Sequence, residues 1–128
     1  MNIPEGLLYT KEHEWAKIEG SKVVVGISDY AQSSLGDITF VELPKVGDEV
    51  KQFKTLTTIE SVKAASDVYA PLTGKVVKIN EKIVNSPEVV NQSSYEDGWF
   101  VVLEIKDENE KKNLMNAADY KTYVEGLS

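Results

Sequence analysis

Residues 55–72 read TLTTIESVKAASDVYAPL, two strand-like runs on either side of a short turn that contains one lysine. Both runs contain the β-branched and aromatic residues that are enriched in strands. Small or apolar neighbours, Val62 and Ala64, flank Lys63 in the turn. The pattern predicts a β-hairpin whose tip, near residues 61–65, holds the Lys63 amine in solvent between two rigid strands.

Other short strand-like segments extend as far as about residue 106, separated by turns that contain glycine or proline. Alternation of side chains predicts three sets that each share one strand face: Val23, Val25 and Ile27; Ile38, Phe40 and Glu42; Trp99, Val101, Leu103 and Ile105. Many short strands with such turns favour a β-sandwich or a flattened barrel.

Two segments have helical patterns. A short helix is predicted over residues 30–35, with Ser28 and Asp29 at its N-cap and Gly36 at its end. A C-terminal helix is predicted from about residue 109 to 124, where apolar side chains recur at helical spacing. No low-complexity linker divides the chain, so we expect a single domain over residues 1–128.

The sequence also contains a short internal repeat. GSKVVVGI at 20–27 is similar to TGKVVKI at 73–79, and KVGDEVKQ at 45–52 is similar to NSPEVVNQ at 85–92. In each half a strand would be followed by a turn and a Glu-Val segment. Two copies in one domain suggest approximate twofold symmetry.

The composition excludes several classes of function. The chain has 128 residues, a formal net charge of −7, 14 basic side chains that are all lysine, and no cysteine. The absence of cysteine rules out a thiol nucleophile and Cys-ligated zinc or iron–sulfur sites. Dispersed lysines among more numerous carboxylates do not favour nucleic acid as a partner. No apolar run approaches membrane-spanning length and no secretory signal is evident, so we expect a soluble, cytoplasmic, bacterial protein.

Candidate catalytic groups are few. His13 is the only histidine, and no nucleophile or metal-binding partner accompanies it, so we interpret it as packed or hydrogen-bonded. Trp15 and Trp99 fit strand alternation as core or rim aromatics. The glycines do not form the spacing of a nucleotide-binding loop.

Several segments, in this order, resemble one family over nearly the whole chain. They are YTKEHEW (9–15), GISDYAQ (26–32), LGDI (35–38), FVELP (40–44), ESVKA (60–64), YAP (69–71), GKV (74–76), Asn91, YEDGW (95–99) and the tail from Leu114 to Tyr123. Together they are similar to the H proteins of the glycine cleavage system.

The resemblance implies a mainly β fold, a lipoyl/biotinyl-type flattened β-sandwich (a barrel-sandwich hybrid) with a short internal helix and a C-terminal helix. It also implies a lipoate cofactor in amide linkage to Lys63, attached by a lipoate ligase or a lipoyl/octanoyl transferase. The protein would be a monomeric, non-catalytic carrier, because the cofactor supplies the chemistry.

In this family the carrier shuttles an aminomethyl group from glycine decarboxylase (P protein), a pyridoxal-phosphate enzyme, to the tetrahydrofolate-dependent aminomethyltransferase (T protein). Dihydrolipoamide dehydrogenase (L protein) then reoxidises the arm. By resemblance, Glu12, Glu14 and Asp67 line a cleft that protects the loaded arm and holds its cationic amine. The alternative is that these acids belong to a solvated, generally acidic surface.

Other functions remain open at this stage. A lipoyl domain of another complex or a biotin carrier would use the same kind of lysine, although biotin domains usually have methionine on both sides of it, where Val62 and Ala64 stand here. An H-like lipoyl donor would use the same tip. A small β-sandwich enzyme or an unmodified interaction module is a further alternative. An unmodified module would tolerate replacement of Lys63, whereas a carrier would not.

Overall fold

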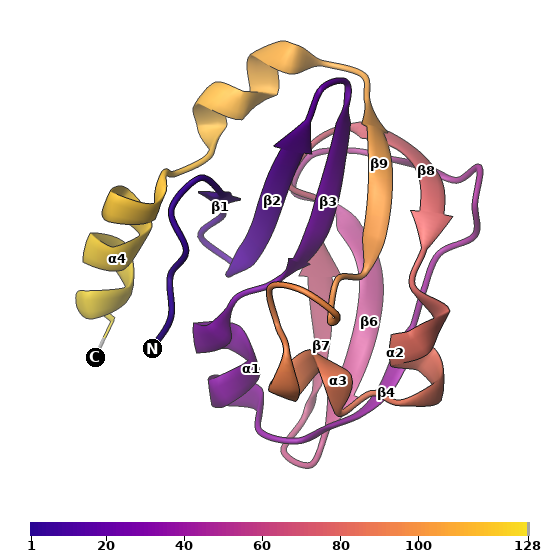
Figure 1. The fold of residues 1–128 in the computed structure, drawn as a ribbon, viewed down its shortest axis with the longest axis vertical. Helices are drawn as coiled ribbons and strands as arrows, with labels where there is room; N and C mark the ends of the chain where they lie inside the picture. The colour runs from indigo at the N-terminus through magenta and orange to yellow at the C-terminus, as the bar shows by residue number, and fades with distance from the viewer. Residues whose placement is uncertain (128) are drawn as a thin grey trace.

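The computed structural model describes residues 1–127, which form two antiparallel β-sheets packed face to face (Figure 1). The strands are β1 (Leu8–Tyr9), β2 (Glu14–Glu19), β3 (Lys22–Ile27), β4 (Ile38–Glu42), β5 (Glu49–Val50), β6 (Thr55–Ser61), β7 (Ala65–Tyr69), β8 (Gly74–Ile79) and β9 (Val101–Ile105). The helices are α1 (Asp29–Leu35), α2 (Glu81–Asn85), α3 (Val89–Gln92) and α4 (Ala117–Glu125), with a 3₁₀ helix, η1, at Glu108–Asn113.

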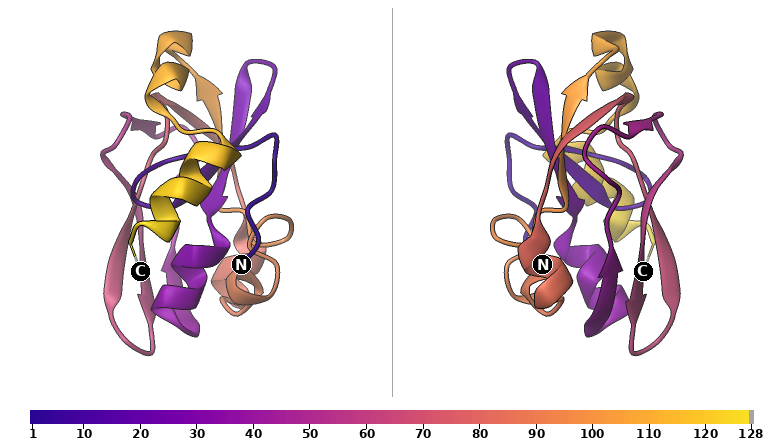
Figure 2. Two further views of the ribbon diagram at one scale, coloured as in Figure 1. Left: turned by 90° about the vertical axis from the view of Figure 1, so that its left-hand side faces the viewer. Right: turned by 90° about the vertical axis from the view of Figure 1, so that its right-hand side faces the viewer.

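One sheet has six strands in the order β1-β2-β3-β9-β8-β5, and the other has three in the order β4-β6-β7. The side views in Figure 2 show the β6–β7 hairpin as an outer layer, with its tip at the same end of the molecule as α1. The mainly β sandwich with a short internal helix and a C-terminal helix is therefore confirmed. None of the helices within residues 1–127 is long and apolar enough to span a membrane.

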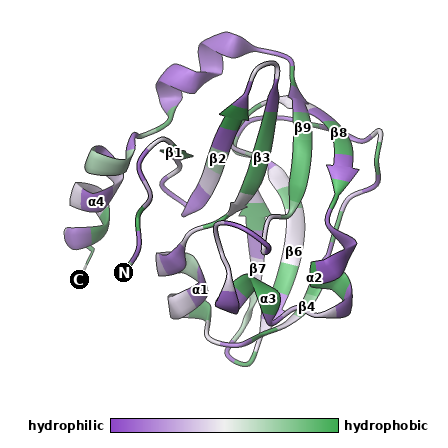
Figure 3. Ribbon diagram, in the orientation of Figure 1, coloured by the Kyte–Doolittle hydropathy of each residue, from purple (hydrophilic) through white to green (hydrophobic). Residues whose placement is uncertain are grey.

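The main core lies between the two sheets, where strand alternation directs apolar side chains from both layers. Its fully enclosed members include Val23, Val25, Ile59, Val76 and Leu103. Figure 3 shows hydrophobic residues along β3 and β9, whereas η1 is hydrophilic.

A second, smaller cluster holds α4 against β1 and β2. Its buried members are Tyr9, Trp15, Tyr120 and Val124. The rings of Tyr9 and Tyr120 stack with centroids 4.4 Å apart and an interplanar angle of 3°. The C-terminal helix is therefore fixed by aromatic contacts as well as by burial of apolar area.

The internal helix begins and ends where its sequence predicts. Ser28 caps α1 by accepting a hydrogen bond from the N–H of Ala31 (3.2 Å), and Gly36 ends the helix with a φ of 75°. A positive φ of this kind is easily adopted only by glycine.

The alternation expected for residues 38–42 is wrong because β4 contains an irregularity. Ile38 pairs with Ser61 and Phe40 pairs with Glu60, so Thr39 has no direct partner. An extra residue of this kind reverses the facing of the side chains that follow it. Ile38 and Val41 therefore both point into the core, whereas Phe40 is 48% exposed.

The face predicted for residues 99–105 is only partly correct. Val101, Leu103 and Ile105 are buried in the main core, as expected. Trp99, however, precedes β9 and packs with the second cluster, and Lys78 Nζ lies 5.5 Å from its ring centroid. Phe100 takes the inward position instead, because its N–H bonds to the carbonyl of Val25 (2.7 Å).

The C-terminal helix is shorter than predicted. The tail forms η1 and then an extended step in which Met115 and Tyr9 exchange two backbone hydrogen bonds of 2.8 Å. Asn116 then caps α4 by accepting from the N–H of Asp119 (2.8 Å). Pairing with Tyr9 competes with helical hydrogen bonding, so the periodic segment is divided in two.

The two copies of the sequence repeat have the same structure in their strands, but they differ in the segments that follow the strands. The two Lys-Val-Val strands, β3 and β8, flank β9, and each leads into a capped helix. Residues 49–50 then form β5, whereas the corresponding part of 85–92 contains α3. Asn91 on α3 bonds the N–H of Ile38 (2.9 Å) and the carbonyl of Gly36 (2.9 Å), so this helix fixes the link into β4.

We predict that Gly26→Ala destabilises the protein by about 1–3 kcal/mol, as overpacking of a core usually does. A Cβ at this position would lie 2.5 Å from Cε2 of Trp15, whose indole N–H is bonded to the carbonyl of Ser94. Denaturant unfolding measures the change. Gly126→Ala is the control, since its Cβ would make only ordinary contacts, and an equal loss in both variants would contradict the steric explanation.

Candidate functional site

The predicted lysine lies at the tip of the β6–β7 hairpin, as the sequence indicates. Ser61 closes the turn: its N–H donates to the carbonyl of Ala64 (2.9 Å). The Ser61 hydroxyl oxygen accepts from the N–H groups of Lys63 and Ala64, each at 3.2 Å. The turn is therefore ordered, although the Lys63 side chain is exposed.

The tip is also attached to the rest of the molecule. The N–H of Val62 donates to the carbonyl of Asp37 (3.0 Å), in the segment between α1 and β4. A Cβ on Gly36 would lie 3.5 Å from Cε of Lys63, so the lysine stem lies along this glycine. Within residues 1–127 no ion pair engages Lys63, so its amine remains available to another molecule.

Among the Asp and Glu side chains of residues 1–127, only that of Glu14 is buried. It belongs to β2 but is only 1% exposed, and it points from the six-stranded sheet toward β7. Its two oxygens accept from the Thr10 hydroxyl (2.5 Å) and from the N–H of Tyr69 (3.1 Å). Burial raises the pKa of Glu14 to about 7, although the hydrogen bond from Thr10 opposes the shift. Glu14 is thus not part of a solvated face.

The loop before β2 positions this carboxyl group. The hydroxyl oxygen of Thr10 accepts from the N–H groups of Glu12 (3.2 Å) and Glu14 (3.1 Å), which leaves its own proton for the carboxylate. His13 has a φ of 74°, and its Nδ1 lies 2.8 Å from the Tyr120 hydroxyl of α4. Burial lowers the pKa of His13. The histidine is therefore packed and hydrogen-bonded, as expected, but in a left-handed turn.

A cleft of about 610 Å³ opens beside this loop. Its lining consists of Thr10, Lys11, Glu12, Phe53, Tyr69, Asn113 and Met115. Glu12 therefore lines the cleft directly. Glu14 lies beneath it, bonded to two lining residues, whereas Asp67 is not part of its wall.

Asp67 occupies a different but related position. It is exposed on β7, and strand alternation places it on the same face as Tyr69, two residues farther along. The hydroxyl of Thr58 on β6 lies 3.5 Å from its carboxylate. Asp67 therefore lies between the lysine tip and the cleft, on the strand that connects them.

The sequence did not identify the apolar side of the cleft. Phe53, Tyr69 and Met115 come from three separate segments that only the tertiary structure brings together. Phe53 has a φ of 64°, unusual for a residue with a side chain, and its N–H donates to the carbonyl of Ala70 (2.7 Å). No local pattern predicts such a conformation.

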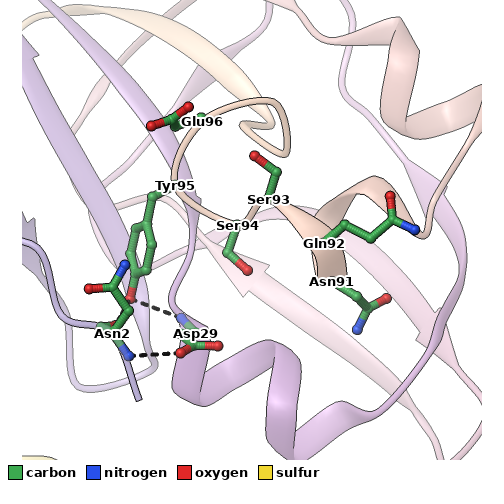
Figure 4. A pocket seen from close by; sticks show the side chains of 8 residues that line it. All are labelled: Asn2, Asp29, Asn91, Gln92, Ser93, Ser94, Tyr95 and Glu96. Atoms are coloured by element: carbon green, nitrogen blue, oxygen red, sulfur yellow. Dashed lines mark hydrogen bonds between the residues drawn. The ribbon is translucent and has the colours of Figure 1, made fainter.

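A second cavity, of about 300 Å³, lies between the N-terminal segment and the residues around α3 (Figure 4). The Tyr95 hydroxyl donates to the carbonyl of Asn2 (2.7 Å) and accepts from the N–H of Asp29 (2.9 Å). The N–H of Asn2 donates to the Asp29 carboxylate (2.8 Å). These contacts fix the N-terminal segment to α1, so we assign Tyr95 a structural role. Within residues 1–127 no cluster of three His, Asp or Glu side chains could hold a metal ion.

Comparison with known proteins identifies one family. The model of the family described as glycine cleavage H-protein matches residues 7–126. A glycine cleavage system H protein of Coprothermobacter proteolyticus is 54% identical over 125 residues, covering 97% of this chain and 98% of its own. That of Halothermothrix orenii is 50% identical over 125 residues, with 98% of both chains covered.

A solved structure gives the same result for the fold. The crystal structure of a glycine cleavage system H protein from Mycobacterium marinum superposes with a TM-score of 0.83 at 32% identity. The match covers 94% of this chain and 97% of the other. The two-sheet arrangement described above is therefore the lipoyl-type β-sandwich of that protein.

We predict that Glu14 makes stability fall as pH rises. Folding raises the pKa of Glu14 from 4.5 to about 7. Between pH 4.5 and 7 the folded state therefore retains a proton on Glu14 that the unfolded state has lost. The contribution of this raised pKa to the free energy of unfolding is full below about pH 4.5 and is lost as the pH rises through about 7.

The measurement is the free energy of unfolding of wild type minus that of Glu14→Gln, followed across this range. We expect the difference to decrease by up to about 3 kcal/mol as pH increases. Other groups that titrate in the same range, including His13, are present in both proteins and cancel. A difference in free energy of unfolding that stays constant with pH would contradict a raised pKa for Glu14.

Proposed function

Because the chain belongs to the glycine cleavage H-protein family, we propose that it carries a lipoyl group on Lys63 for aminomethyl transfer. In this proposal the carrier moves the aminomethyl group from glycine decarboxylase to the tetrahydrofolate-dependent aminomethyltransferase. The observation that carries the proposal is the geometry of the tip: an exposed amine that makes no ion pair within residues 1–127, on a turn held at both ends.

The tip has the properties that covalent attachment requires. Lys63 is exposed in the turn at the end of the hairpin, where the active site of a lipoate ligase or a lipoyl/octanoyl transferase would have access to its amine. Ser61 and Asp37 hold the backbone, so the root of the arm keeps a fixed position. Conversion of the amine to an amide removes its charge.

In this proposal the lipoyl group and the protein have different roles. When attached, the lipoyl group supplies the sulfur that accepts the aminomethyl group, and dihydrolipoamide dehydrogenase restores its disulfide. The protein supplies the root of the arm and a place that excludes water. Catalysis itself resides in the partner enzymes.

The cleft borders β7, the strand that leaves the Lys63 turn. Four steps along this strand, from Ala65 to Tyr69, span about 13 Å, and the arm would start two residues before Ala65. Twelve bonds from the lysine Cα to a lipoyl sulfur span about 15 Å, at roughly 1.25 Å per bond. The apolar side chains of Phe53 and Met115 suit the hydrocarbon part of the arm.

The acidic residues suit the amine of the carried group. Asp67 lies along the route, Glu12 lines the cleft and Glu14 lies beneath it. With a pKa of about 7, Glu14 is near the midpoint of its titration at neutral pH, and a nearby cation would favour its charged form. Exclusion of water would slow hydrolytic loss of the group.

We predict that Lys63→Arg folds normally but accepts no lipoate. A guanidinium group does not form the lipoyl amide, and an exposed substitution usually changes stability by no more than about 0.5 kcal/mol. Intact mass and peptide mapping after treatment with an active ligase are the measurements, followed by glycine–bicarbonate exchange. Lys54→Arg, on another exposed lysine, is the control and should be lipoylated fully. Exchange supported by the Lys63→Arg protein would overturn the proposal.

We also predict that neutralising the acids shortens the lifetime of the loaded carrier. Formaldehyde release in the absence of aminomethyltransferase should be faster for Glu12→Gln and Glu14→Gln than for wild type. Asp67→Asn should have the smallest effect, because Asp67 is exposed and lies outside the cleft wall, and an exposed ion pair contributes only about 0.2–1 kcal/mol. Added salt should reduce the effect of Asp67→Asn and leave that of Glu14→Gln nearly unchanged. Equal release rates in all four proteins would mean that these acids do not protect the group.

A further inference from the structure

An exposed apolar hollow lies on the edge of the three-stranded sheet opposite to the cleft. It has a volume of about 470 Å³ and lies between β4 and α2. We call it the β4–α2 surface and define it by Phe40, Glu42, Leu43, Ile79, Glu81 and Val84. The cleft borders β7, at the other edge of the same sheet, so the two features are separate.

The hollow presents an aromatic side chain that has no place in the core. Phe40 is 48% exposed and its neighbour across the hollow, Val84, is 44% exposed. The irregularity at Thr39 is what turns the Phe40 ring outward while Ile38 and Val41 stay buried. Such irregularities in strands often direct a side chain toward a functional position.

The surface is continuous with the root of the arm. Phe40 lies directly opposite Glu60, which is three residues from Lys63 along the chain. Three residues of extended strand span about 10 Å. A molecule that covers this surface would therefore lie beside the point from which the arm projects.

The charged side chains that line the hollow are all acidic. Glu42 and Glu81 border it, and no lysine is among the residues that line it. The lysine of α2, Lys82, lies 4.0 Å from Asp97 and is not among the lining residues. A complementary partner would offer an apolar recess bordered by lysine or arginine. A second copy of this acidic chain would bring like charges together, which disfavours self-association.

We infer that the β4–α2 surface is the docking surface for an enzyme that uses the arm, with Phe40 as its apolar anchor. The partner has a basic rim and an apolar recess at the entrance through which the arm passes. Aromatic anchors of this kind contribute a large share of binding at protein interfaces, and rim charges mainly raise the rate of association. The inference rests on the proposed carrier function, and glycine decarboxylase is the partner on which we test it.

The test uses a protein that docks without an arm. Unlipoylated Lys63→Ala protein is added as a competitor while lipoylated wild type supports glycine–bicarbonate exchange by glycine decarboxylase, and the inhibition constant Ki is measured. We expect competitive inhibition. Adding Phe40→Ala to this competitor should raise Ki about tenfold or more, as loss of an anchor does. Adding Glu42→Lys should raise Ki mainly at low salt.

Two variants of the same competitor are the controls. Leu127→Ala removes an apolar side chain of similar exposure, 47%, and Glu19→Lys reverses an exposed charge on β2. Both should leave Ki unchanged, and thermal unfolding should confirm that every variant is folded. If the Phe40→Ala competitor inhibits as well as its parent, if the parent does not inhibit, or if the controls lose inhibition equally, the inference is overturned. If lipoylated wild type supports no exchange, the proposed function itself fails.

Discussion

A carboxyl group buried between the two sheets connects the two walls of the cleft. Glu14 extends from β2 in one sheet to the N–H of Tyr69 on β7 in the other, and Thr10 holds its second oxygen. A buried carboxylate is costly unless its acceptors are satisfied, so the position of the Thr10–Glu14 loop is tied to the position of β7. The cleft between loop and strand is a consequence of this connection.

The same connection explains why residues from distant parts of the chain contribute to the cleft. The carbonyl of Lys11 accepts from the Tyr123 hydroxyl (3.0 Å), and His13 contacts Tyr120, so α4 fixes the loop from outside. Met115 pairs with Tyr9 and reaches the cleft as part of its wall. The C-terminal segment is thus part of the cleft wall, although it lies far from Lys63 in sequence.

Local sequence predicted the parts of the structure that local interactions determine. The hairpin with Lys63 at its tip and the helix capped by Ser28 follow from turn and capping chemistry within a few residues. The outward turn of Phe40 and the division of the tail at Met115 depend on pairing with distant strands or loops. The resemblance suggested Glu12, Glu14 and Asp67 together, but only the tertiary structure distinguishes a lining, a buried and an exposed position.

The two edges of the three-stranded sheet give the carrier two separate surfaces around one lysine. The cleft lies at the β7 edge and the β4–α2 surface at the opposite edge, with Lys63 at the end of the hairpin between them. In the proposed function, a lipoyl arm on Lys63 would occupy either the cleft or the active site of a partner, so the cleft would compete with every enzyme that receives the arm. Retention in the cleft would then have to be weak enough to be reversed by docking. The half-exposed Phe53 in the cleft wall and a carboxyl group with a pKa near 7 would suit such reversible retention, whereas a deep, fully charged pocket would hold the arm against transfer.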